Sequence, residues 1–116
     1  MPSLKKIVLD KKEYFFAYKV VTQDMKSLGL RKNPNIIEFE LGKWIYLPKN
    51  EIERSSDDWG GIWVARTFSN AKKLGEYMQE KYKIKTRIFE TALDKILFEN
   101  SYRIKTNGVN LFEEIL

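Results

Sequence analysis

Four basic side chains of this 116-residue chain stand on or beside expected strands, where they could bind phosphate: Arg66, Arg87, Arg103 and Lys105. A guanidinium group binds phosphate through paired hydrogen bonds and also stacks on aromatic rings. Aromatic residues of neighbouring strands could stack bases beside these cations, namely Trp44, Tyr46, Trp63 and Tyr102. Such a sheet surface would bind single-stranded nucleic acid. The candidate binding residues are therefore Arg66, Arg87, Tyr102, Arg103 and Lys105.

The same cations have a structural alternative. Arginines on strands form cross-strand ion pairs with carboxylates at the rim of a sheet. Acidic partners on expected strands are available: Glu38, Glu40, Glu90 and Glu99. Aromatic residues on strands are also more often part of a core than of a stacking surface. The pattern of residues favours this structural interpretation and leaves the binding site as the alternative.

The loop that ends in Trp59, Gly60 and Gly61 is a second candidate site. Paired glycines before an apolar strand indicate a positive φ, or the close approach of another group. A tight turn explains them most simply, and contact with a ligand is the alternative. The preceding loop carries oxygen ligands at Glu51, Glu53, Ser55, Ser56, Asp57 and Asp58. Their spacing does not match a calcium-binding loop, so we predict a solvated loop and no metal site.

Composition excludes several kinds of chemistry. The chain has no cysteine and no histidine. Disulfides, thiolate zinc sites, cysteine nucleophiles and serine–histidine triads are therefore excluded. The glycines match neither phosphate-binding pattern, so we expect no nucleotide cofactor of standard type. We identify no catalytic residue, and the residue types favour a binding protein over an enzyme.

The charge of the chain is positive but uneven. Residues 1–34 hold eight basic and three acidic side chains, residues 35–60 three and six, and residues 61–116 ten and seven. A net charge of +5 favours encounter with nucleic acid, although solvated surface lysines are the simplest explanation of that charge. The apolar run after Lys6 stops at Asp10. We therefore predict no signal peptide or membrane span, and a cytoplasmic protein, in the host cell if it is viral.

The first half of the chain reads mainly as strands. Residues 7–9 and 13–21 are expected strands, and the second has apolar residues on both faces, typical of a central strand covered on each side. Residues 22–35 read as a long ordered loop or a short helical turn. Alternation over residues 37–41, the pair Gly42-Lys43 and the apolar residues 44–47 predict a hairpin with Glu38 and Glu40 exposed.

The second half contains the one expected helix. Residues 61–67 read as a strand, and helical spacing of apolar residues predicts an amphipathic helix over residues 69–82, capped by Ser69 or Asn70. Strands follow at 86–90, 95–98, 102–105 and, after the Asn107-Gly108 turn, 109–112; residues 91–95 could instead form one helical turn. We predict one α+β domain over residues 1–116. Its sheet is expected to be strongly bent and mainly antiparallel, with a half-open barrel as the alternative, and the helix is expected to pack on one face.

Several short segments follow one another in a distinctive order: Tyr18-Lys19-Val20-Val21, Ser27-Leu28-Gly29, Gly42-Lys43-Trp44, Gly60-Gly61-Ile62-Trp63-Val64, Ala71 and Tyr102-Arg103-Ile104-Lys105. Together they resemble a diffuse group of small domains from phages, archaeal viruses and mobile elements. The resemblance implies a mobile-element origin, but no activity and no catalytic residue. A more distant similarity to ADP-ribosyltransferase-like folds implies a compact β-rich domain. The histidine-bearing first motif and the S-T-S segment of those folds are absent.

Three classes of function remain. The first is a small binding module that holds single-stranded nucleic acid on a basic and aromatic sheet surface. The second is a viral or mobile-element factor that binds a host protein. The third is a histidine-free transferase or hydrolase with an ADP-ribosyltransferase-like fold. Salt-sensitive binding of DNA or RNA would favour the first, a protein partner or self-association the second, and a polar cleft with a carboxylate of raised pKa the third.

Overall fold

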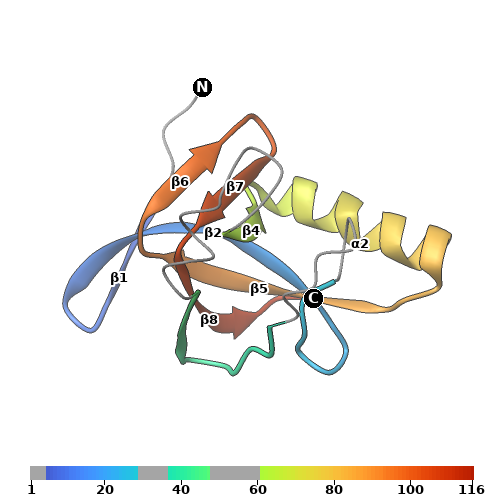
Figure 1. Cartoon of the computed structure of the whole chain (residues 1–116), viewed down its shortest axis with the longest axis horizontal. Coiled ribbons are helices and arrows are strands. Elements are labelled where there is room, and N and C mark those ends of the chain that lie inside the picture. Colours follow the sequence, from blue (N-terminus) through green and yellow to red (C-terminus); the bar gives the residue numbers. More distant parts are fainter. Residues whose placement is uncertain (1–4, 29–36, 48–60) are drawn as a thin grey trace.

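An eight-stranded antiparallel sheet and one helix form the fold of residues 5–28, 37–47 and 61–116, the part of the chain that the computed structural model describes (Figure 1). In chain order the elements are β1 (Lys6–Leu9), β2 (Lys12–Thr22), β3 (Trp44–Tyr46), β4 (Ile62–Ala65), α2 (Phe68–Tyr82), β5 (Thr86–Leu93), β6 (Ile96–Glu99), β7 (Arg103–Thr106) and β8 (Gly108–Glu114). The spatial order is β3-β8-β5-β2-β4-β7-β6, with β1 paired to β2. The sheet does not close into a barrel. The predicted α+β fold, a single compact domain, is confirmed.

Strand β2 is the central strand, as predicted. It pairs with β5 from Phe15 to Thr22, but with β4 only where Tyr18 faces Ala65. Successive side chains of a strand point to opposite faces of the sheet. Ala17 and Val21 therefore point to one face, which we call the inner face, and Tyr18 and Val20 to the other, which we call the outer face.

The inner face carries the main hydrophobic core. Alternate residues of the strands are buried there and are mostly aliphatic: Ala17, Val21, Ile62, Val64, Phe89, Leu93, Ile104, Val109 and Leu111. Phe39 and Leu47 complete this cluster from the segment around β3. Burial of a large aliphatic side chain stabilises a fold by roughly 1.5–3 kcal/mol. The predicted core positions Ile62 and Val64 are thus confirmed.

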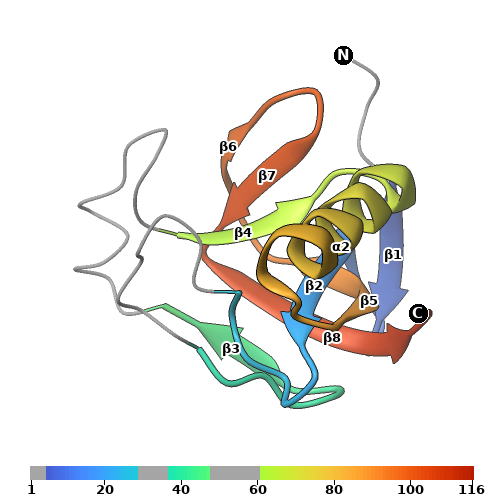
Figure 2. The same ribbon diagram turned by 90° about the vertical axis from the view of Figure 1, so that its right-hand side faces the viewer.

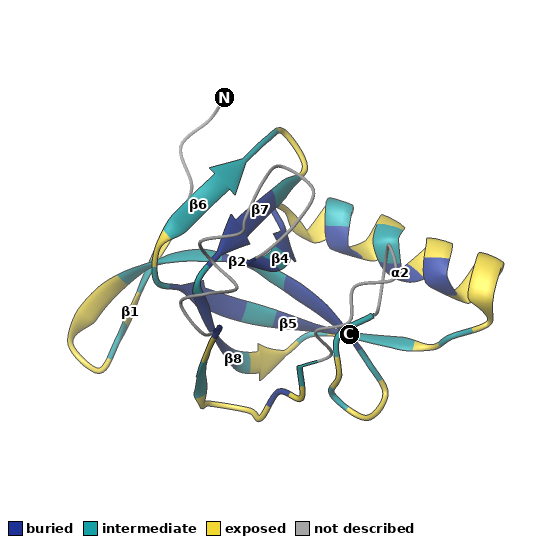
Figure 3. Ribbon diagram, in the orientation of Figure 1, coloured by how far each residue is buried: buried dark blue, intermediate teal, exposed yellow. Residues whose placement is uncertain are grey.

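The outer face is covered only in part. Helix α2 lies against β2, β4 and β5 (Figure 2), where Ala71 packs with Val20, Ala65 and Ile88. Gly75 allows this close approach, because a Cβ there would lie 2.8 Å from Oγ1 of Thr86. Figure 3 shows that β2 is buried beneath the helix but partly exposed over its first half. The prediction that β2 is covered on each side is therefore wrong for that half.

The turn at Asp94 and Lys95 is hydrogen-bonded to the turn at Asn107 and Gly108. The Asp94 amide donates to the Gly108 carbonyl, and the Lys95 amide donates to Oδ1 of Asn107. The Thr106 hydroxyl donates to the Lys95 carbonyl. The turn at Asn107 and Gly108 is therefore present, but it forms no hairpin. Strand β7 pairs with β4 and β6, whereas β8 pairs with β5 and β3.

The predicted hairpin over residues 37–47 is wrong. Strand β3 pairs with β8 over the register Trp44–Asn110, and Glu38 makes an isolated bridge with Lys26 instead. Gly42, with a φ of 76°, turns the chain, but its amide already donates to the Leu111 carbonyl of β8. The turn at Gly42 therefore leads into β3, which pairs with β8 and not with the residues before the turn. Glu38 and Glu40 are exposed, as predicted.

Two local predictions need correction. Helix α2 begins one residue before the expected start and is capped by Thr67, whose hydroxyl accepts from the Asn70 amide, rather than by Ser69 or Asn70. The alternative of a helical turn over residues 91–95 is also wrong, because β5 continues to Leu93 in register with β2 and β8. A local cap at Thr67 sets the start of the helix, whereas strand pairing extends β5 beyond its local preference.

Candidate nucleic-acid interface

Two of the predicted binding residues, Arg103 and Lys105, lie on β7 beside Trp63 of β4, and a third, Tyr102, comes just before that strand. Trp63 faces Lys105 across the two strands, and Ala65 faces Arg103. The guanidinium carbon of Arg103 lies 4.1 Å from the centre of the Trp63 ring, and Nζ of Lys105 lies 5.6 Å from it. The Tyr102 ring, half of it exposed, is 5.7 Å from the same guanidinium. A cation over an indole face is a favourable pair that also orients the ring.

Lys105 is buried beside Gly61, one of the predicted loop residues. Only 2% of Lys105 is exposed. Gly61 has a φ of 71°, and a Cβ at this position would lie 2.3 Å from Cγ of Lys105. The glycine is thus required by the backbone and by a packed lysine stem, which is the structural explanation. Trp59, Gly60 and the acidic loop from Glu51 to Asp58 lie outside the described residues.

The other two arginines form ion pairs. NH1 of Arg66 lies 3.7 Å from a carboxylate oxygen of Glu99 and donates to the Asn100 carbonyl. Arg87 donates from Nε and NH2 to both carboxylate oxygens of Glu114, at 2.9 and 2.7 Å. The structural interpretation is confirmed for these two, although Glu114 was not among the expected partners. Arg87 also lies on β5, on the other side of β2 from β7.

Sequence reasoning found only Trp44 and Tyr46 of a row of aromatic residues on the outer face, which we call the aromatic stripe. Its members come from four elements, and none of them is buried: Tyr14, Phe16, Tyr18, Trp44, Tyr46, Phe68 and Phe112. Ring centres lie 4.7 Å apart for Tyr14 and Trp44 and 5.8 Å apart for Trp44 and Tyr46. Phe16 contacts Tyr18 and Phe112, and Tyr18 contacts Phe68 at the start of α2. The ring contacts thus form two groups, one at β3 and one that reaches the helix, which lie next to each other because Tyr14 and Phe16 are two residues apart on β2.

Small residues beneath the stripe explain why its rings spread over the sheet. The ring of Tyr46 covers Gly108, where a Cβ would lie 2.3 Å from Cε1 of the ring. Across the sheet Trp44 faces Asn110, Asn110 faces Ala92, and Ala92 faces Phe16. These short side chains let rings from β2 and β3 meet above them. Tyr46 therefore packs on backbone while half of it stays exposed.

Hydrogen-bond acceptors accompany the rings. Glu90 faces Tyr18 on one side and Glu113 on the other. Burial, the charge of Glu113 and a hydrogen bond to it raise the pKa of the Glu90 carboxyl. Asn110 is 6% exposed, and its Oδ1 has no hydrogen-bond partner within the described ranges. A buried acceptor without a donor is unusual and marks a place where a donor would be favoured.

Lys19 is the one lysine of β2 that points to the inner face beside Val64 and Phe39. Its Nζ donates to the Trp63 carbonyl at 2.6 Å and lies 5.4 Å from the Phe39 ring. Burial lowers the pKa of this amine to about 8. Strands β2 and β4 share a single residue pair here. Lys19 thus donates a hydrogen bond to β4 where backbone pairing between β2 and β4 is limited to one residue pair. No pattern in the sequence indicated this role.

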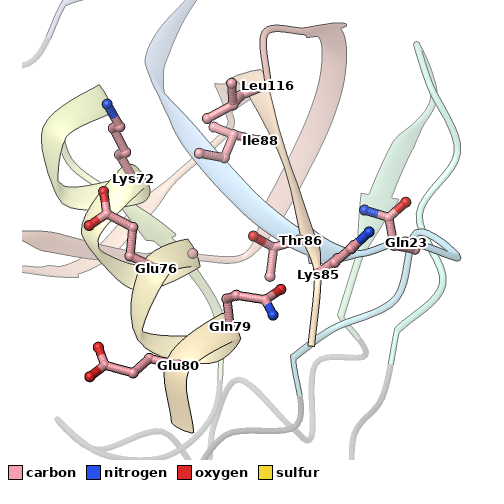
Figure 4. Close-up of a pocket in the computed structure, with 10 residues that line it drawn as sticks. Gln23, Lys72, Glu76, Gln79, Glu80, Lys85, Thr86, Ile88 and Leu116 are labelled. Carbon is pink, nitrogen blue, oxygen red and sulfur yellow. The ribbon is translucent and has the colours of Figure 1, made fainter. Parts of the chain in front are cut away.

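A pocket of about 460 Å³ lies between α2 and β5 (Figure 4). Ile88 and Leu116 form an apolar part of its lining. Figure 4 shows that its charged groups do not converge: Lys72 and Lys85 lie on opposite sides, and the Glu80 carboxyl points away from β5. No group of three acidic side chains in the described segments could hold a metal ion. No helix there is long and apolar enough to cross a membrane.

No protein family, curated protein or solved structure matches the chain. The resemblance to small domains of phages, archaeal viruses and mobile elements therefore stays a prediction. The site has to be judged from its own geometry: a stripe of exposed rings, a cation-flanked tryptophan and a few acceptors on one face of a sheet.

Proposed function

We propose that the protein binds single-stranded nucleic acid on the outer face of its sheet, with bases stacked on the aromatic stripe. The observation that carries this proposal is a set of seven aromatic residues on one side of the sheet, of which two are exposed and five are partly exposed. Burial of these rings would have been the expected state if they served the core alone. Base–aromatic stacking is tolerant of sequence, because every base has a π-face.

Charge supports the proposal. The chain carries a net charge of +5, and Lys12 reaches over the Tyr14 ring at 5.4 Å. Lys11 and Lys95 are exposed near the same end of the stripe, in the turns that follow β1 and β5. Phosphates bound at these amines would release counterions, which gives binding its salt dependence. An intracellular location, where such a ligand is found, belongs to this proposal.

The carboxylates of Glu90 and Glu113 restrict the path of the ligand. A phosphate would be repelled by the negative charge that this pair of carboxyl groups carries on neighbouring strands. The sugar–phosphate backbone would therefore pass along the lysine-bearing end of the stripe, with the bases turned toward β5. Tyr102 and Arg103 would provide a second contact region around Trp63, whereas Arg66 and Arg87 are held by Glu99 and Glu114.

A protein partner is the alternative ligand for this face. Tyrosine and tryptophan are enriched at protein interfaces as well as at base-stacking surfaces. The enzyme alternative has less support, because Glu90, whose pKa is raised, lies on an open sheet face and does not line the pocket between α2 and β5. Binding measurements separate the two binding proposals directly.

The test compares two pairs of aromatic substitutions. Tyr14→Leu with Trp44→Leu removes two π-faces of the stripe and keeps apolar bulk. Tyr77→Leu with Tyr82→Leu is the control, because these two rings also contact each other but lie exposed on α2. Fluorescence anisotropy with labelled DNA and RNA strands of about 12 nucleotides gives the affinity at several salt concentrations.

We expect the stripe variant to lose at least about tenfold in affinity and the helix variant to lose little, since one stacked base contributes roughly 1–3 kcal/mol. Wild-type affinity should fall as salt rises. Equal losses in both variants would place the ligand elsewhere. Absence of salt-sensitive binding by the wild-type protein would contradict the proposal and leave the protein partner as the better explanation.

A further inference from the structure

We propose that Glu90 makes the stripe selective for guanine, which extends and rests on the proposed binding of single strands. The argument begins with position. The register of the sheet sets Glu90 directly beside Tyr18, and Tyr18 contacts Phe16 at 5.2 Å between ring centres. A base stacked over these rings would bring one of its edges to the carboxylate. Single-stranded bases are recognised in this way, by stacking together with hydrogen bonds to their edges.

The chemistry of a carboxylate then selects the base. An ionised carboxylate only accepts hydrogen bonds, through two oxygens side by side. Guanine presents two adjacent donors on its Watson–Crick edge, N1–H and the N2 amino group. Adenine and cytosine present one amino donor next to a ring nitrogen that accepts, and thymine or uracil present one N–H between two carbonyl oxygens. Only guanine can therefore satisfy both oxygens without placing an acceptor against the carboxylate.

The surroundings strengthen this selection. Glu113 faces Glu90 across β5 and β8, so two carboxylates lie together and favour a donor. Oδ1 of Asn110, which has no hydrogen-bond partner among the residues that the structure describes, is a further acceptor on the same face, on a side chain more than nine-tenths buried two residues along β8 from Phe112. Partial burial of Glu90 also makes each hydrogen bond to it stronger than the same bond in water. Hydrogen-bond donors are therefore favoured on this face, and guanine presents two adjacent donors on one edge.

The experiment uses the full chain and thymidine strands of about 12 nucleotides that carry one central guanine, inosine, adenine or cytosine. Inosine keeps N1–H but lacks the N2 amino group. We expect the guanine strand to bind about tenfold more tightly than the adenine and cytosine strands, with inosine in between. In Glu90→Gln the guanine preference should shrink to less than about twofold.

Glu80→Gln is the control, because it removes the same charge from a carboxylate that points away from β5 (Figure 4). This variant should keep the guanine preference, and circular dichroism should show all variants folded. Tight binding without any preference, or a preference that survives in Glu90→Gln, would overturn this inference and leave the proposed function standing. Absence of binding to every strand would overturn both.

Discussion

The two faces of the sheet are built from the same strands but with different chemistry. Along β2, Ala17 and Val21 point inward and are fully buried, whereas Tyr14, Phe16 and Tyr18 point outward and stay partly exposed. The inner face is mostly aliphatic and closed by Phe39 and Leu47. Among the described residues, the outer face is covered by α2 over β2, β4 and β5, whereas the rings over the first half of β2 stay partly exposed. A strand with apolar residues on both faces therefore need not be covered on both.

The difference separates stability from binding. The inner face is closely packed and forms the core. Lys19 also lies on this face and donates a hydrogen bond to the Trp63 carbonyl. The rings of the outer face rest on Gly108, Ala92 and Asn110, so they have support from below and exposure above. Substitutions on the inner face should then lower stability, and substitutions on the outer face should lower ligand affinity.

The largest expected effect contrasts two phenylalanines. Phe89→Ala on the inner face should lower the free energy of unfolding by about 3–5 kcal/mol, because it leaves a cavity in the main core. Phe16→Ala on the outer face should lower it by about 1–2 kcal/mol, since that ring is already partly exposed. Urea denaturation gives both values. Equal losses would mean that the two faces are packed alike.

The next prediction concerns the buried amine of Lys19. Because its pKa is about 8 in the folded protein and 10.5 for an ordinary lysine, the unfolded chain binds a proton between these pH values that the folded chain lacks. Stability should therefore rise as pH increases from about 8 to 10.5, by up to about 3 kcal/mol from this one group. Lys19→Met should lose this rise relative to the wild-type protein. Parallel stability curves for the two proteins would show that the amine is hydrated.

The smallest expected effect concerns Arg87, which is paired with Glu114 and lies outside the proposed binding surface. Arg87 and Glu114 are paired at 2.7 Å with side chains 30% and 40% exposed. A double-mutant cycle with Arg87→Met and Glu114→Gln should give a coupling energy of about 0.2–1 kcal/mol. Neither variant should weaken binding of single strands by more than about twofold apart from the general effect of net charge. A large loss in Arg87→Met would return this residue to the binding site.

Local patterns predicted most of the fold. The density of aromatic and β-branched residues located β2, helical spacing located α2, and the apolar run after Gly61 located β4. The pairing of strands could not be predicted in the same way. The turn at Gly42 and the turn at Asn107 both look like hairpin turns, yet each carries the chain to a strand distant in sequence. Such pairings depend on the whole core rather than on the two residues of a turn.

The candidate site was predicted less completely. Trp63, Arg103 and Lys105 were each recognised as candidates from residue type, but only the pairing of β4 with β7 in the structure brings them together. The aromatic stripe had a visible signal in the alternation of Tyr14, Phe16 and Tyr18. Its exposure, however, depends on how far α2 extends over the sheet, and the sequence does not encode that locally. The partner of Arg87 lies 27 residues away on β8, which no local pattern could identify.

Ligand-induced shifts of aromatic side-chain resonances test the central claim most directly. A ¹H–¹³C spectrum of the aromatic rings, recorded while a single strand is titrated into the protein, observes both faces of the sheet at once. We predict that the ring signals of Tyr14, Trp44 and Tyr46 move as bases stack on them, while those of Phe39 and Phe89 stay in place. A strand that binds without moving the outer rings, or that moves inner and outer rings alike, would contradict the division between a packed inner face and a binding outer face.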